Sequence, residues 1–189
     1  MPRRSARNAD SVGSIVIAAI HTSCGVLSLI AGSCVCVTPK GTKRHVLLGR
    51  LYCLCIVTLN VSAFGIYTLF GAFGVFHVCA IVSLLTVGAG LAPVLMKPRF
   101  KNWLQTHYQF MAWSYAGLLA ATSKEAFVHI RPLQRLARAT TPFFPLIVMF
   151  VILIVSAIVI SRLQAGALSK YGRRAIAILV RACSRLMQP

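Results

Sequence analysis

The sequence predicts an all-α protein: a polytopic transmembrane helical bundle with a four-helix core, a fifth span and a C-terminal amphipathic interfacial helix. Hydrophobic residues make up 58% of the 189 residues, well above the usual share in a soluble domain. They form long runs without a formal charge, the longest of which covers residues 51–96. The 20 lysines and arginines lie in short clusters between these runs, and the chain has only two acidic residues. This alternation is typical of membrane spans and their loops.

The first span is expected at residues 12–37, after a basic N-terminal segment, residues 1–11. The uncharged run that contains this span is longer than the apolar region of a signal peptide. We therefore expect a retained span, with cleavage as the alternative. This span opens a core domain of four spans over residues 12–125.

The longest run is expected to hold two spans, because a hydrocarbon core about 30 Å thick needs only about 20 helical residues. Glycines in segment 71–74 predict the turn between them. We expect the second span at residues 46–70 and the third at residues 73–96. A fourth span is expected at residues 103–122, which are uncharged but include His107 and other polar side chains.

The C-terminal third is expected to have three parts. Residues 126–140 are polar and basic and predict a loop. The fifth span, within residues 141–162, has almost no polar side chains and is expected at the periphery of the bundle. The tail, residues 163–189, gathers basic side chains in one sector of a helical wheel and apolar ones in the rest. That pattern is typical of an interfacial amphipathic helix, and a solvated basic tail is the alternative.

The net charge of +18 raises the question of a nucleic-acid partner, but a nucleic-acid domain would mix its charges along the chain. Basic clusters between apolar runs indicate loops that face an anionic leaflet. We therefore expect a lipid bilayer with anionic headgroups as partner, and no nucleic acid. A membrane-protein partner or a homo-oligomer stays open. The positive-inside rule favours a cytoplasmic C-terminus, and we expect an integral protein of the plasma membrane, the inner membrane of a cell.

The sequence carries no pattern of a soluble-type enzyme. It has no P-loop, no Gly-x-Gly-x2-Gly, no Gly-x-Ser-x-Gly and no His-Glu-x2-His. With two acidic residues, it has no intramembrane carboxylate pair. We therefore assign no catalytic residue and expect no enzyme. The seven cysteines lack the spacing of zinc or redox sites and are expected to be small packing residues.

Three histidines, His21, His45 and His107, each begin a stripe of small, flexible or hydroxylated residues on one face of a helix. Because a membrane helix does not turn an imidazole or a carboxylate towards hydrocarbon, these stripes are expected to face other helices or a cavity. Small residues there would let a neighbouring backbone or a flat ligand come close. The positions expected to line these faces or a pathway are Gly25, Gly32, Gly49, Tyr52, Asn60, Met111, Ser114, Tyr115 and Glu125.

His45 and His107 are expected at the same side of the membrane, where they could meet. As a pair they could ligate a metal, hold the iron of haem b or bond to lipid headgroups. Basic residues near them could neutralise haem propionates or bind phospholipid headgroups; these are Lys43, Arg44, Arg50, Arg99 and Lys101. His77 is expected to form a hydrogen bond at a helix interface, and His129 to be solvated.

Three blocks of the chain resemble the membrane proteins of domain-of-unknown-function family 2306. They read His21-x3-Gly25-x6-Gly32, then Lys40-Gly41-Thr42-x2-His45-x3-Gly49-Arg50-x-Tyr52, then His107-x3-Met111-x2-Ser114-Tyr115. The resemblance covers residues 12–125 and leaves the fifth span and the tail outside. It implies a four-helix core with family-typical positions at the three histidines. It carries no settled activity.

Three functions remain open on this sequence. The first is a haem or redox protein for transmembrane electron transfer. The placement of histidines on facing helices is similar to that in transmembrane b-type cytochromes, which is an analogy only. The second is a non-enzymatic scaffold or accessory protein whose histidines bond between helices. The third is a small proton-linked transporter, with a pathway lined by His21, Asn60, His107 and Glu125.

Overall fold

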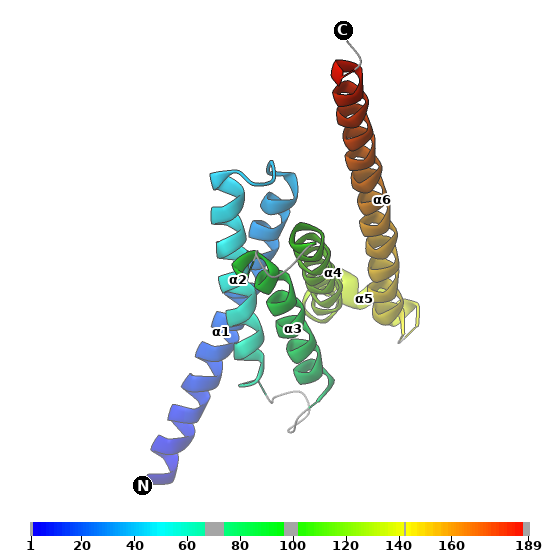
Figure 1. Cartoon of the computed structure of the whole chain (residues 1–189). Coiled ribbons are helices and arrows are strands. Elements are labelled where there is room, and N and C mark those ends of the chain that lie inside the picture. The colour runs from blue at the N-terminus through cyan, green and yellow to red at the C-terminus, as the bar shows by residue number, and fades with distance from the viewer. Residues whose placement is uncertain (1, 67–73, 97–101, 142, 187–189) are drawn as a thin grey trace.

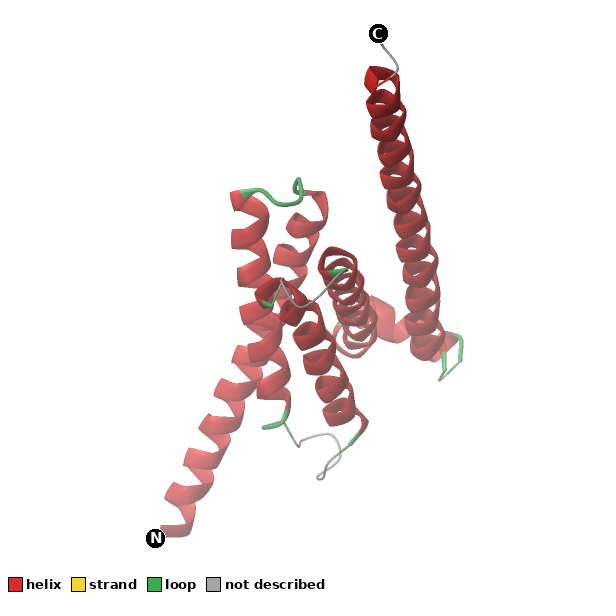
Figure 2. Ribbon diagram, in the orientation of Figure 1, coloured by secondary structure: helices red, strands yellow, loops and turns green. Residues whose placement is uncertain are grey.

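The structure of the chain, a computed structural model, describes residues 2–66, 74–96, 102–141 and 143–186 (Figure 1). Side chains are described for residues 12–66, 74, 76–96, 102–141 and 143–165. The helices are α1 (Pro2–Val37), α2 (Lys43–Ala63), α3 (Val75–Leu95), α4 (Trp103–His129), α5 (Arg131–Ala139) and α6 (Phe144–Leu186). These described ranges contain no strand (Figure 2), which confirms the all-α prediction.

The helices α1 and α2 form a hairpin, α3 packs on α2 and α4, and α4 also contacts α1, α5 and α6. In Figure 1 the N-terminal part of α1 extends past the end of α2, and α6 stands beside the other helices. Because the main contacts of α6 are with α4, the fifth predicted span lies at the periphery, as expected.

Among the described residues, four helical segments are long and apolar enough to cross a membrane: Val12–Val37, Lys43–Ala63, Phe76–Leu95 and Phe144–Ala165. Large apolar side chains remain exposed along them, as lipid-facing side chains would be. Together these features identify an integral membrane protein with several spans. The predicted fourth span forms as α4, but its polar side chains keep it outside this group, so its membrane crossing stays a prediction.

Several boundaries differ from the predicted ones. Helix α2 ends at Ala63, before the predicted Phe70, and most of the predicted turn lies outside the described residues. The expected basic loop at residues 126–140 is wrong in part, because α4 continues to His129 and α5 follows at once. Tail residues from 163 onward continue α6 to Leu186 without a break. The segment from Ser161 to Leu186 contains no proline that would end the helix. The interfacial placement of this tail stays a prediction.

The turn between α1 and α2 explains part of the second sequence block. Lys40 Nζ donates to the carbonyl oxygens of Val35 at 2.5 Å and Cys36 at 3.2 Å, so a cation caps the C-terminal end of α1. Gly41 has a φ of 81°, which favours glycine. Thr42 Oγ1 accepts a hydrogen bond from the backbone N–H of His45 at 3.2 Å and so caps the start of α2.

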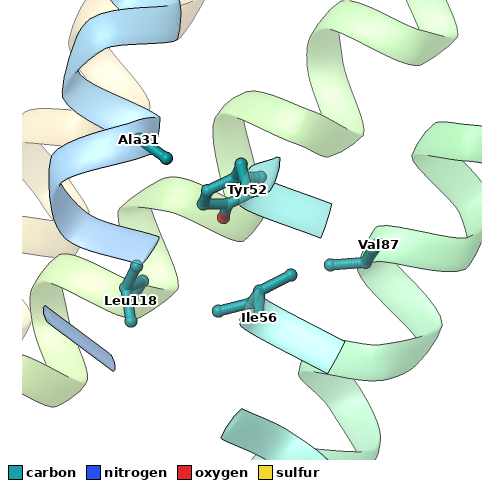
Figure 3. Close-up of a cluster of buried hydrophobic side chains, with 5 residues drawn as sticks. All are labelled: Ala31, Tyr52, Ile56, Val87 and Leu118. Carbon is teal, nitrogen blue, oxygen red and sulfur yellow. The ribbon is translucent and has the colours of Figure 1, made fainter. Parts of the chain in front are cut away.

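The first four helices share one core. A cluster of buried side chains takes Ala31 from α1, Tyr52 and Ile56 from α2, Val87 from α3 and Leu118 from α4 (Figure 3). Each of these side chains is at most 6% exposed. The predicted four-helix core is therefore confirmed.

Gly32 allows the closest approach within this core. A Cβ at this position would overlap the ring of Tyr115 and lie 3.2 Å from Cε2 of Tyr52. Gly49, on α2, differs: a Cβ there would meet no described atom within 4 Å. Two glycines singled out by the same sequence pattern thus have opposite surroundings.

We expect Gly32→Ala to lower the free energy of unfolding by about 1–3 kcal/mol, because an aromatic ring in a packed core has to move. Gly49→Ala is the matched control and should be neutral or stabilising by up to about 1 kcal/mol, since alanine favours a helix interior over glycine. Unfolding of the detergent-purified protein by a denaturing detergent, followed by circular dichroism, measures both. Equal stability of the two variants would contradict the close approach at Gly32.

Candidate functional site

A buried hydrogen bond joins two of the sequence blocks. Tyr52 Oη on α2 and Ser114 Oγ on α4 lie 2.8 Å apart, and the two side chains are 2% and 4% exposed. In an environment without water, such a pair satisfies two polar groups at once. This bond holds α2 at a defined distance from α4.

The neighbouring residue Tyr115 ties α4 to α1. Its hydroxyl lies 2.6 Å from Ser33 Oγ and donates to the carbonyl oxygen of Leu29 at 3.4 Å. The rings of Tyr52 and Tyr115 meet edge to face, with centroids 6.3 Å apart and an interplanar angle of 68°. Gly32, Tyr52, Ser114 and Tyr115 therefore form one junction of three helices.

His107 bonds to the backbone of the neighbouring helix. Its Nδ1 lies 2.7 Å from the carbonyl oxygen of Gly90 on α3. Because a carbonyl can only accept, Nδ1 carries the proton, and the lone pair of the neutral ring is on Nε2. The approach is close here too, since a Cβ at Gly90 would lie 2.8 Å from Sδ of Met111.

His45 lies in the first turn of α2 and is half-buried. Its Nδ1 is buried and has no hydrogen-bond partner among the described residues. His45 and His107 each lie seven residues before one partner of the Tyr52–Ser114 hydrogen bond, on α2 and α4 respectively. The structure thus brings these two histidines into one region at the end of the bundle that carries the turn between α1 and α2.

His21 lies elsewhere. Its Nδ1 donates to the carbonyl oxygen of Leu59 at 3.0 Å and lies 3.1 Å from Ser62 Oγ, near the far end of α2. Along α1 it is ~24 Å from Val37 at about 1.5 Å per residue, whereas His45 follows directly after the turn. The three histidines do not gather around one centre. No group of three or more His, Cys, Asp or Glu residues in the described part of the chain could hold a metal ion.

The other residues that were expected to line the stripes or a pathway lie at helix interfaces or helix ends. Asn60 Nδ2 donates to the carbonyl oxygen of Ile56 at 2.7 Å and to Ser83 Oγ on α3 at 2.9 Å. A Cβ at Gly25 would make ordinary contact with Leu59 at 3.5 Å. Glu125 lies at the exposed end of α4, where Oε2 is 3.3 Å from Nε2 of His129.

His77 is 3% exposed, and its expected hydrogen bond at a helix interface stays a prediction. Its Nδ1 accepts the backbone N–H of Gly74 at 3.1 Å, so it caps the start of its own helix. The expected solvation of His129 agrees with its exposure of 75%, although the side chain pairs with Glu125.

Lys43, Arg44 and Arg50 are exposed near His45 on α2, consistent with a position among headgroups or anionic groups. Arg99 and Lys101 lie outside the described residues. The sequence analysis missed four partners of the polar contacts: Ser33, Ser62, Ser83 and the carbonyl of Gly90. Small residues inside apolar runs were the available signal, but the sequence does not say which of them faces a histidine or a tyrosine.

Comparisons with known proteins agree with this architecture. The family model described as predicted membrane protein, DUF2306, matches residues 18–165. The match extends beyond residue 125, where the resemblance in sequence was expected to end, and takes in α5 and the membrane part of α6. No curated protein and no solved structure matches the chain.

We expect Tyr52→Phe and Ser114→Ala to destabilise the protein, and their double variant to lose less than the sum of the two. The reason is that both variants remove the same buried hydrogen bond, which is worth about 0.6 kcal/mol on average and up to about 1.7 kcal/mol between membrane helices. Unfolding by a denaturing detergent measures the cycle. Tyr108→Phe, which removes a half-buried hydroxyl elsewhere on α4, is the control. Strict additivity would show that the two hydroxyls act separately.

Proposed function

We propose that this chain, which belongs to the DUF2306 family of predicted membrane proteins, is a membrane electron carrier that holds haem b between His45 and His107. One observation carries the proposal: His107 is oriented by a hydrogen bond from Nδ1 to a backbone carbonyl, and His45, at the same end of the bundle, has a buried Nδ1 without a hydrogen-bond partner among the described residues.

His107 has the arrangement expected of an iron ligand. Histidines that ligate a metal usually donate their other ring N–H to a carbonyl or a carboxylate, which sets the tautomer and the ring orientation. The bond of 2.7 Å to Gly90 is of this kind. It leaves Nε2 with the lone pair that a haem iron requires.

His45 supports the proposal because its buried Nδ1 has no hydrogen-bond partner among the described residues. A buried nitrogen without a hydrogen-bond partner costs about 1–3 kcal/mol. A bound group that ligates the ring or accepts its proton would remove the penalty. His45 would then be the second histidine that holds the haem, on the helix next to that of His107.

The surroundings fit a flat, anionic cofactor. One turn after His45, the open space at Gly49 leaves room beside the ring. Lys43, Arg44 and Arg50 are exposed at this end of α2 and could neutralise two propionates through charge-assisted hydrogen bonds. Haem, when bound, supplies a one-electron couple. The protein residues bind it, orient its ligands and compensate its charge.

A second candidate is a non-enzymatic scaffold or accessory protein. The observation that favours it is the use of most polar stripe residues in bonds between helices: His21 with Leu59, Asn60 with Ser83, and Tyr52 with Ser114. In such a protein the histidines would hold helices together. A proton-linked transporter receives less support, because Glu125 is paired with His129 at the exposed end of α4.

The proposed location is the plasma membrane with the C-terminus in the cytoplasm. The support is the larger share of basic residues on that side of the predicted spans. The region of His45 and His107 would then face the cytoplasm.

The visible absorption spectrum of the detergent-purified protein supplied with haemin is recorded in the oxidised state and again after reduction with dithionite. We expect a b-type spectrum in both states. His45→Ala and His107→Ala should each lose the reduced band, because bis-histidine ligation needs both rings. His129→Ala, which changes an exposed histidine on α4, is the control and should keep it. The absence of a reduced b-type band, once free haemin has been removed on a column, would reject the proposal and favour the scaffold.

A further inference from the structure

The short helix α5 presents three arginines on one face. Arg131, Arg135 and Arg138 follow each other at intervals of four and three residues, so they lie within one sector of the helix. All three side chains are exposed. Figure 1 shows α5 between the end of α4 and the start of α6.

The opposite face of α5 is apolar. Leu133 and Ala137 are half-buried, and Leu136 beside them is 49% exposed. The membrane part of α6 begins at Phe144, only a few residues after α5 ends. A helix with this division of side chains, so close to a span, is placed to lie at the boundary between hydrocarbon and headgroups.

The direction of α5 is set by its contacts with α4. Gln134 Nε2 donates to the carbonyl oxygen of Val128 in the last turn of α4, and the N–H of Ile130 bonds to Ala126 at 2.9 Å. Pro132 in the first turn of α5 suits a helix start. The arginine face is therefore held in place by the fold.

The described part of the chain supplies these arginines with no counterion. It contains 20 lysines and arginines but only two acidic residues. One of the two, Glu125, is paired with His129; the other, Asp10, belongs to α1. Within the described ranges no ion pair involves an arginine of α5. The anions that balance this face must come from outside the chain.

We propose that Arg131, Arg135 and Arg138 form a binding site for the phosphate headgroups of anionic phospholipids. A guanidinium binds phosphate through two parallel hydrogen bonds, and the apolar side of α5 would lie among the acyl chains. This site is separate from the region of His45 and His107 and does not depend on the proposed function.

The test uses the full-length protein in phosphatidylcholine vesicles with a trace of spin-labelled lipid. The preference for phosphatidylglycerol over phosphatidylcholine is measured as the fraction of each spin-labelled lipid whose motion the protein restricts. Replacing all three arginines by glutamine should lower this preference at least about fivefold, the effect of one basic residue at an anionic membrane surface. Replacing all three by lysine should keep most of it, because the charge remains.

A second triple variant separates this site from net charge. Lys43→Gln, Arg44→Gln and Arg50→Gln together remove the same charge at the other end of the protein, and should lower the preference less than the α5 variant does. An equal loss in both would overturn the proposal in favour of net charge. Displacement of the labelled lipid by millimolar inorganic phosphate would overturn it in favour of a soluble anion site. If the triple variant does not fold, Arg135→Gln alone is measured, and an unchanged preference would overturn the proposal.

Discussion

The hydrogen bond between Tyr52 and Ser114 is the contact on which the arrangement of the core helices depends most directly. It joins α2 to α4 at 2.8 Å inside the bundle, beside the point where Gly32 of α1 admits the ring of Tyr115. Lipid does not drive apolar helices together as water does, so close packing and interhelical hydrogen bonds have to hold them. This junction supplies both, and it lies two helical turns after His45 and His107 on their own helices.

The polar groups at the two ends of the core differ in how they are satisfied. At one end His21 bonds to Leu59 and lies beside Ser62, and Asn60 bonds to Ser83. At the other end His107 is oriented by Gly90, while His45 retains a buried nitrogen without a partner in the described part of the chain. Buried polar groups are nearly always paired, and this nitrogen is the observation from which the proposed ligand site at this end is argued.

The positive charge of the protein must be balanced almost entirely by anions from outside the chain. The described residues contain one ion pair, between Glu125 and His129, against a net charge of +18 for the whole chain. Exposed basic residues stand at both ends of the spans, Lys43 and Arg44 at one and the arginines of α5 at the other. A bilayer with anionic headgroups is the environment in which such a surface is stable.

The sequence by itself determined the helices and their polar faces, because span length and helical periodicity are local properties of the chain. It predicted the four-helix core and the peripheral fifth span, and it singled out Gly32, Tyr52, Ser114 and Tyr115 without indicating that they meet. Only the tertiary structure decided which partner each polar group meets. Gly32 and Gly49 carry the same sequence signal, yet one is closed by a tyrosine ring and the other is open. His21 and His45 head similar stripes, yet they lie at opposite ends of the bundle. Such differences arise from how helices far apart in the sequence cross each other, and no pattern along a single helix contains that information.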